Sequence, residues 1–515
     1  MRARVARGSF VVLLAASVTW VGAGQFARGA SSSCDWPMYQ HDTSRTGAAA
    51  AGCDAIGPQN AATLAPRWFA PTKGGVTASP IVVGDTVFVG DNAGIFYAIT
   101  ATTGTVAWQF NIRDNTIHDD QHKTPYLGIL SSAAHENGTV YFGGGGTVWA
   151  LDAASGSPVW AVDTDPSAPT SRMEVESSPV VHNGVVYVGT DVNESSTQHA
   201  TGLLAINAAT GDLLWKFNPE DRSVSTTLSP TVTGHACGDI WSSPAVDDAD
   251  GLVVFGLGNC NTASYVATAG EGIEAVRADT GAFAWHFGDG RDDFDDDFGA
   301  TPIVSPLPVT DVTGVVHPSV VLAAGKSGHV FVLDGPTGTN LRDTQLGQPG
   351  QTGPRAAGAI GGFIGSDAVG VTSPITATMF AGSAVPLPFE GKGPTAGEVQ
   401  PDGTLTNDPA RLSSLHAIDI ATGRILWHQP LETPTYAAVT YANGVVFAPS
   451  TTSFAEAAYD AATGTPLWHA PDGAAPSSAV AVVGPNIFYG AGTTFSGQPP
   501  QAFGVWSYGL PSILP

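Results

Sequence analysis

The sequence predicts an all-β protein, and within that class an eight-bladed β-propeller of four-stranded antiparallel blades. Three observations support this: one turn signature recurs along the chain, paired β runs precede each turn, and Gly and Pro are plentiful although 43% of residues are hydrophobic. A seven-bladed ring is the alternative. A two-sheet sandwich is disfavoured, because sandwiches rarely repeat one turn signature.

The recurring turn reads Ala-x-Asp-x-x-x-Gly-x-x-x-Trp or a close variant. An Asp or Asn side chain can bond its own turn backbone, Gly supplies positive φ, and a Trp ring can seal the joint between neighbouring sheets. One copy is degenerate and ends in Arg instead of Trp. The copies span Ala98 to Trp108, Ala150 to Trp160, Ala205 to Trp215, Ala275 to Trp285, Val332 to Arg342, Ala417 to Trp427, and Ala458 to Trp468.

Each turn follows two short apolar runs whose alternation and β-branching are typical of antiparallel strands. The last pair lacks its own turn and ends near Trp506, whereas Trp68 precedes the first pair. We therefore expect the ring to close by combining N- and C-terminal strands, which removes exposed edges. The eight pairs start near Ala78, Ser131, Ser177, Ser242, Ala300, Ser373, Ala437 and Ser477.

These pairs assign residues 34–515 to a single domain. The stretch from Gln345 to Thr406 is long and rich in Gly, Pro and Ala, so we expect an irregular blade and a surface loop there.

Residues 1–30 have the pattern of a secretory signal peptide: three early arginines, then an apolar run from Phe10 to about Ala23, then small residues. An uncleaved anchor is the alternative. No later segment is long and apolar enough to span a membrane. The net charge of −25 disfavours nucleic acid and anionic membranes as partners. The sequence thus predicts a secreted, extracellular or cell-envelope protein.

Four cysteines and a secretory start predict two disulfides. Three pairings are possible, and proximity in sequence favours Cys34–Cys53 with Cys237–Cys260. No CxxCH motif is present, so no covalent haem is expected.

The turns resemble those of the quinoprotein alcohol dehydrogenases, which use pyrroloquinoline quinone (PQQ). The opening Asp35-Trp-Pro-Met-Tyr-Gln-His-Asp42 is similar to the start of the polyvinyl-alcohol-dehydrogenase-like branch. Non-catalytic propellers, such as the outer-membrane assembly lipoprotein of the BamB type, share the turns.

Further segments resemble the parts of that family that carry its site. Asp239-Ile-Trp241 and Gly256-Leu-Gly-Asn259 are similar to the T-x-W and G-T-G-N strands, so the resemblance implies Trp241 as the floor under the quinone and Asn259 as a calcium ligand. Asp295-Asp-Asp297-Phe resembles the W-D-Y/F segment, which implies Asp297 as catalytic base and metal ligand. Val188 to Glu194 is similar to the segment that supplies a glutamate calcium ligand, here Glu194.

Two cationic residues complete the set. Gly325-Lys326-Ser-Gly resembles the K-x-G turn whose cation faces the quinone oxygens. The family's arginine after the calcium glutamate is missing, because Ala200-Thr201-Gly202 stands there, and Arg172 is the candidate replacement. The family's adjacent cysteine pair is also absent.

The resemblance implies a PQQ- and Ca²⁺-dependent dehydrogenase. Calcium prefers hard oxygen ligands, a carboxylate can take a hydroxyl proton, and an aromatic floor can stack under a flat ring. The expected partners are an alcohol, with secondary and polymeric alcohols as candidates, and an external electron acceptor such as a cytochrome. The alternative is a non-catalytic scaffold of the BamB type in the cell envelope.

Overall fold

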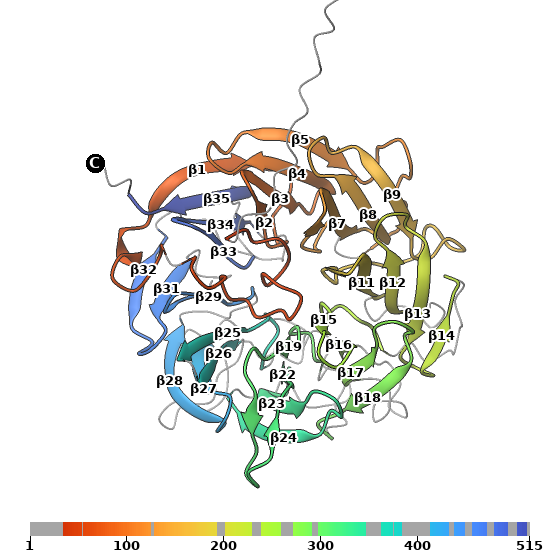
Figure 1. Cartoon of the computed structure of the whole chain (residues 1–515). Coiled ribbons are helices and arrows are strands. Elements are labelled where there is room, and N and C mark those ends of the chain that lie inside the picture. The colour runs from red at the N-terminus through yellow and green to blue at the C-terminus, as the bar shows by residue number, and fades with distance from the viewer. Residues whose placement is uncertain are drawn as a thin grey trace, which may run out of the picture.

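The computed structural model is an all-β ring of radial blades around a central axis (Figure 1). Its only described helix is the short 3-10 turn η1 (Ala61–Thr63). No helix in the described part of the chain is long and apolar enough to cross a bilayer. The structure describes residues 34–53, 55–124, 128–192, 201–228, 238–258, 271–290, 297–346, 362–373, 375–383, 413–431, 437–448, 456–470, 478–492 and 502–511.

Eight antiparallel sheets form the eight predicted blades. In the first four, the strands run outward from the axis in chain order, and the third blade carries a fifth strand. Their strands are β2 (Ile81–Val83), β3 (Thr86–Gly90), β4 (Ile95–Thr100) and β5 (Val106–Asn111); β6 (Ala134–Glu136), β7 (Thr139–Gly144), β8 (Thr147–Asp152) and β9 (Pro158–Asp163); β10 (Val180–His182), β11 (Val185–Thr190), β12 (Gly202–Asn207), β13 (Leu213–Asn218) and β14 (Ser223–Ser225); β15 (Ala245–Asp247), β16 (Leu252–Leu257), β17 (Gly272–Arg277) and β18 (Phe283–Phe287).

The remaining blades follow the same plan, and the fifth carries an extra two-stranded hairpin. Their strands are β19 (Ile303–Val304), β22 (Val320–Ala324), β23 (His329–Asp334) and β24 (Asn340–Gln345), with the hairpin β20 (Val309–Thr310) and β21 (Val316–His317); β25 (Ala368–Ser373), β26 (Thr376–Ser383), β27 (Ser413–Asp419) and β28 (Arg424–Leu431); β29 (Thr440–Ala442), β30 (Val445–Phe447), β31 (Ala457–Asp460) and β32 (Pro466–His469); β33 (Ala481–Val483), β34 (Asn486–Ala491), β35 (Gly504–Gly509) and β1 (Ala65–Pro71).

The ring closes in the eighth blade, as the sequence predicts. There β1 pairs with β35, so the first strand of the chain is the outermost strand of the last blade (Figure 1). This pairing removes the free edge that each end of the chain would otherwise present.

The expected start of the sixth pair near Ser373 is wrong. β25 begins at Ala368, and Ser373 is its last residue, at the hairpin that leads into β26. The dipeptide Ser373-Pro374 looks like the Ser-Pro pairs that open other blades, but Ser366 takes that inner position. Its Oγ accepts a hydrogen bond from the Thr301 N–H of the fifth blade.

The turn signature works as predicted, because each Trp docks on the next blade. The Trp108 indole donates to the Ala153 carbonyl, and a Cβ on Gly156 (φ +70°) would lie only 2.5 Å from that ring. Glycine is therefore required both for the turn and for the indole that lies on it. In the degenerate copy, Arg342 donates to the Ala421 carbonyl and so makes the same contact.

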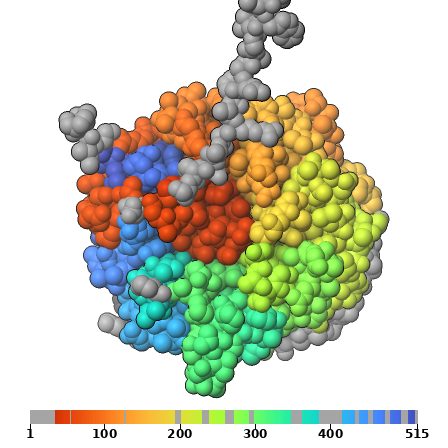
Figure 2. Space-filling view, viewed as in Figure 1, coloured from red at the N-terminus to blue at the C-terminus, as the bar shows by residue number. Residues whose placement is uncertain are grey.

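An axial segment, residues 36–47, runs along the inner strands at the centre of the ring. Figure 2 shows this N-terminal part of the chain in the middle of one face of the ring. Backbone hydrogen bonds link it to inner strands of six blades, for example Val246 N–H to the Thr43 carbonyl and Val304 N–H to the Ser44 carbonyl. The buried Arg45 guanidinium donates to three carbonyls, those of Tyr39, Ser178 and Pro244.

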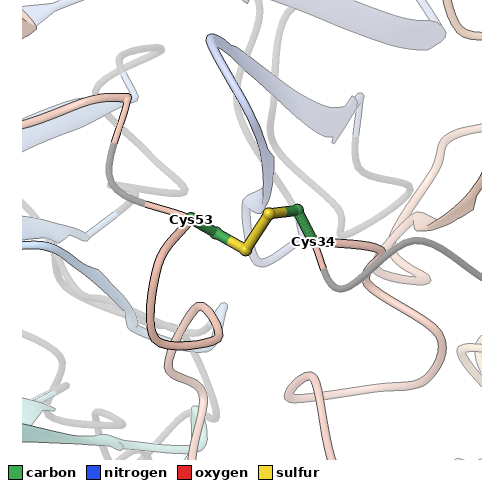
Figure 3. The surroundings of a disulfide bond; sticks show 2 residues. All are labelled: Cys34 and Cys53. Carbon is green, nitrogen blue, oxygen red and sulfur yellow. A yellow bond between two sulfur atoms is a disulfide. The ribbon is translucent and has the colours of Figure 1, made fainter.

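The predicted Cys34–Cys53 disulfide is present and ties the start of this segment to the chain that follows it (Figure 3). Cys237 and Cys260 lie outside the described residues, so their pairing stays a prediction.

A belt of hydroxyl groups joins the blades near the axis and fixes the segments that carry the candidate site. The Ser178 N–H donates to Ser243 Oγ, the Ser243 N–H to Thr301 Oγ1, and the Thr301 N–H to Ser366 Oγ. These residues lie just before the inner strands of successive blades.

Candidate functional site

The candidate site lies at the end of the blades where the inner strands begin. The candidate side chains stand before those strands or just after the second strands, which are antiparallel to them. Trp241 precedes β15, Asp297 precedes β19, and Lys326 follows β22. The site therefore draws on blades 4 and 5, which are neighbours in the ring (Figure 1).

Three predicted residues meet there. Lys326 Nζ donates to Asp297 Oδ2 over 2.6 Å, and the same ammonium lies 5.6 Å from the centroid of the Trp241 ring. The Asp297 and Lys326 side chains are only 1% and 10% exposed, while Trp241 is partly exposed. A buried ion pair beside an aromatic ring that reaches solvent is therefore the centre of the described site.

Two glycines allow this close assembly. A Cβ on Gly299 would overlap the far edge of the Trp241 ring, and one on Gly258 would lie 2.7 Å from the Asp297 carboxylate. Backbone thus packs directly against the indole and the carboxylate, which fixes both in place.

The other predicted residues are not joined to this group by the structure. Glu194 and Asn259 lie outside the described residues. Arg172 is exposed, and within the described chain it makes no hydrogen bond or ion pair with Trp241, Asp297 or Lys326. The roles of Glu194, Asn259 and Arg172 stay predictions.

The structure adds an acid cluster that sequence reasoning missed. It consists of Glu174, Glu176 and Asp191, each of which places a carboxylate oxygen within 4.8 Å of the others. Burial raises the pKa of Glu176 to about 7. Burial, together with the charges of Glu176, Glu174 and Asp239, also raises the pKa of the Asp191 carboxyl well above its usual range.

This acid cluster adjoins the predicted site through Asp239, which is two residues before Trp241. The Val192 N–H lies 3.5 Å from Asp239 Oδ2, and the Ile240 N–H donates to the Thr190 carbonyl. A sequence signal was available: Glu-x-Glu before a strand places both side chains on one face.

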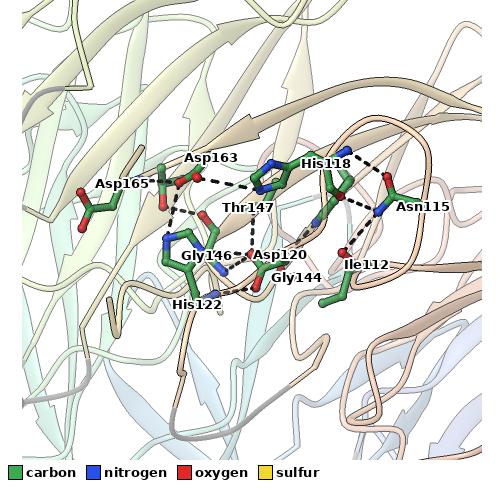
Figure 4. A network of polar contacts seen from close by, with 12 residues as sticks. Ile112, Asn115, His118, Asp120, His122, Gly144, Gly146, Thr147, Asp163 and Asp165 are labelled. Atoms are coloured by element: carbon green, nitrogen blue, oxygen red, sulfur yellow. Dashed lines mark hydrogen bonds and ion pairs between the residues drawn. The ribbon is translucent and has the colours of Figure 1, made fainter. Parts of the chain in front are cut away.

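A second polar network joins the connection between blades 1 and 2 to blade 2 itself (Figure 4). His122 Nδ1 lies 3.2 Å from Asp120 Oδ2, and its Nε2 lies 3.4 Å from Asp163 Oδ1. Asp120 also accepts from the Gly146 N–H and the Thr147 hydroxyl. Although burial opposes a charge on His122, the hydrogen bond and the charge of Asp120, with Asp163 and Asp165, raise its pKa.

Curated relatives of this chain include proteins named as alcohol dehydrogenases and as polyvinylalcohol dehydrogenases. "Alcohol dehydrogenase (quinone), dehydrogenase subunit" of Komagataeibacter europaeus is 28% identical over 327 residues, which cover 55% of this chain and 42% of the relative. "Polyvinylalcohol dehydrogenase" of Pseudomonas sp is 26% identical over 242 residues, covering 42% of this chain and 35% of the relative. The matched region is thus less than half of the length of these relatives.

Solved structures share the fold at low identity. The quinohemoprotein alcohol dehydrogenase from Comamonas testosteroni has a TM-score of 0.70 at 20% identity, over 94% of this chain and 81% of that one. BamB from Moraxella catarrhalis has a TM-score of 0.51 at 15% identity, over 88% and 98%.

Two family models match the sequence. That of the outer membrane protein assembly factor BamB covers residues 398–499, a small part of the chain. That of the glucose/ethanol/alcohol dehydrogenase β-propeller domain covers residues 36–348, which is more than half of it. The chain therefore belongs to the family of PQQ-type glucose/ethanol/alcohol dehydrogenase β-propeller domains.

Proposed function

We propose that this chain is a quinoprotein dehydrogenase that oxidises an alcohol with PQQ and Ca²⁺ and passes the electrons to an external acceptor such as a cytochrome. The observation that carries the proposal is the buried Asp297 carboxylate, held by Lys326 beside the partly exposed Trp241 ring. Secretion through residues 1–30 belongs to the same proposal.

The described residues fit such a cofactor. The Trp241 indole is a flat apolar surface for a planar ring, and the Lys326 ammonium, 5.6 Å from the ring centroid, can donate to carbonyl oxygens of a ring stacked there. Asp297, with Glu194 and Asn259, would supply the oxygen ligands that Ca²⁺ prefers. When bound, the quinone supplies the hydride acceptor, which no protein side chain provides.

The chain itself would supply the proton chemistry. Asp297 is the candidate base for the alcohol hydroxyl proton, because it is a carboxylate shielded from bulk water. Lys326 holds one of its oxygens at 2.6 Å and so orients the other. Gly258 and Gly299 keep the base and the aromatic floor in fixed relative positions.

The proposal is tested by reconstitution. The purified full chain is titrated with PQQ in the presence of Ca²⁺, with binding followed by tryptophan fluorescence, and dye reduction is measured with primary, secondary and polymeric alcohols. We expect saturable binding and alcohol-dependent dye reduction. Binding without reduction of dye by any alcohol would contradict the dehydrogenase proposal.

Asp297→Asn tests the base within this system. We expect turnover to fall by about 10²–10⁴-fold while PQQ still binds, because the amide cannot accept the proton. Asp248→Asn is the matched control, since its side chain is 77% exposed at the hairpin between β15 and β16 and the change should leave turnover unchanged. Equal turnover of Asp297→Asn and the wild type would remove Asp297 from this role.

A non-catalytic scaffold of the BamB type is the second candidate. It is favoured by the BamB model match to residues 398–499 and by the shared propeller fold. A scaffold would bind no PQQ, and substitution of Trp241 or Lys326 would leave its partner binding unchanged.

A further inference from the structure

The acid cluster is built by backbone pairing at the start of blade 3. Glu174 and Asp191 face each other in an antiparallel bridge and exchange both hydrogen bonds, at 2.9 and 3.1 Å. Directly opposed residues point their side chains to the same face of a ladder. Glu176 stands two residues after Glu174 and shares that face, whereas Val175 points the other way and packs against Gly143.

Two of the three acids are buried, Glu176 is partly exposed, and the cluster contains carboxylate oxygens without a hydrogen-bond donor among the described residues. Glu174 and Asp191 are each only 2% exposed. Among the described residues, no donor reaches the buried atoms Asp191 Oδ1 and Glu176 Oε1. Asp239 lies close enough to add its negative charge to that of Asp191. A buried carboxylate without a donor or a countercharge is strongly unfavourable, so the site needs a positive partner.

We propose that Glu174, Glu176 and Asp191 bind one hard divalent cation of the Ca²⁺ type. This ligand set shares no residue with the one predicted from the resemblance, which is Glu194, Asn259 and Asp297. The inference therefore does not depend on the proposed dehydrogenase activity.

The geometry fits a calcium ion. Ca²⁺ binds carboxylate oxygens at about 2.4 Å, so two oxygens on one ion can be at most about 4.8 Å apart. The three carboxylates satisfy that limit. Each can bind through one or both oxygens, and together they offer up to six ligand atoms, the number that Ca²⁺ requires at minimum. Three negative charges also favour a dication over a monovalent ion.

The cation would join two segments and change the charge beside the candidate site. It would fasten the entry to β10, through Glu174 and Glu176, against the exit of β11, through Asp191. It would also offset the negative charge near Asp239, two residues before Trp241. The surroundings of the Trp241 ring would then be less repulsive to an anionic ligand.

Calcium titration of the chelator-treated full chain, without PQQ, tests the proposal. Isothermal titration calorimetry is performed on the variant Asp297→Asn, in which a ligand of the family-type set has been removed. We expect this variant still to bind Ca²⁺, and Asp297→Asn/Asp191→Asn and Asp297→Asn/Glu176→Gln to bind at least about tenfold more weakly, because affinity follows the number of charged ligands. Asp297→Asn/Asp248→Asn is the matched control and should bind like Asp297→Asn.

Thermal unfolding gives a second readout. In chelator, Asp191→Asn should unfold at a higher temperature than the wild type, because one mutually repelling charge is gone. In excess Ca²⁺ the order should reverse, since only the wild type retains the complete ligand set.

The outcomes separate this inference from the dehydrogenase proposal. Equal Ca²⁺ affinity of Asp297→Asn with and without Asp191→Asn, or no Ca²⁺ binding at all, would overturn the cation site and leave a shared proton as the countercharge. Calcium binding at the cluster without PQQ-dependent activity would sustain the site and contradict the dehydrogenase.

Discussion

Blade 1 and blade 3 each bury an aspartate at the end of their second strand, and they do so in opposite ways. In blade 1, Asp91 is fully buried and accepts hydrogen bonds from four backbone N–H groups and the Tyr97 hydroxyl, all between 2.9 and 3.1 Å. In blade 3, Asp191 faces Glu174 and Glu176, and no donor in the described chain reaches its Oδ1.

The difference separates structural acids from functional ones. Asp91 is stabilised by the fold itself, because the surrounding backbone supplies donors for both oxygens. The fold places Asp191 beside other acids and, within the described chain, supplies no donor to its Oδ1. Its negative charge therefore needs a positive partner that the fold does not supply. Acids of this second kind are expected where a protein binds a cation.

The largest effect is expected when Asp91 is changed. Asp91→Asn should destabilise the protein by about 4 kcal/mol, because an amide cannot accept from five donors and each buried donor left unpaired costs on the order of 1–3 kcal/mol. Urea unfolding in chelator measures this loss. In chelator, Asp191→Asn should instead increase the free energy of unfolding. A similar decrease for both variants would contradict the comparison.

Lys326→Met sharpens the comparison by turning Asp297 into a buried acid without its cation. We expect a loss of about 3 kcal/mol in the free energy of unfolding, since removal of one partner leaves a buried charge uncompensated. The double variant Lys326→Met/Asp297→Asn should recover much of that loss. If it does not, the ion pair is not what stabilises Asp297.

The His122 network is an intermediate case, in which a histidine whose pKa is raised lies 3.2 Å from the Asp120 carboxylate (Figure 4). Because the pKa of His122 is raised on folding, its stabilising contribution is complete below the unfolded pKa of about 6.5 and is lost as pH rises through the folded value. Thermal unfolding of wild type and His122→Gln should therefore converge toward alkaline pH. A constant difference from pH 5 to 9 would contradict this assignment.

The smallest effect is expected at Asp248, which water can solvate. Its side chain is 77% exposed and lies 2.9 Å from the His182 ring. Asp248→Asn should change the free energy of unfolding by less than about 0.5 kcal/mol, as measured by urea unfolding. A larger change in the free energy of unfolding would mean that the exposure of the side chain does not explain the ranking of these variants.

The repeat made the ring predictable. A Trp four residues after a turn Gly has a local meaning, because the indole of one blade docks on the turn of the next, as Trp108 does on Gly156. The closure of the ring was predicted from two tryptophans outside the complete repeats, Trp68 before the first strand pair and Trp506 after the last. The start near Ser373 was wrong because Ser373, the last residue of β25, is followed by Pro in the sequence just as the serines near the axis are.

Within the site, the sequence identified the residues that follow a family pattern, and the structure brings Trp241, Asp297 and Lys326 together. The sequence did not reveal the acid cluster, whose members stand outside the repeat. Glu176 and Asp191 are fifteen positions apart, and their closeness depends on an antiparallel bridge that no local pattern specifies.

By itself, the sequence determined the type and number of blades, the closure and the Cys34–Cys53 link, because these arise from local periodicity and from short separations along the chain. Only the tertiary structure decided which acids face each other and which are supplied with donors. The reason is physical: the environment of a buried charge is set by segments that meet across a ladder or between blades, and a linear sequence does not record those distances.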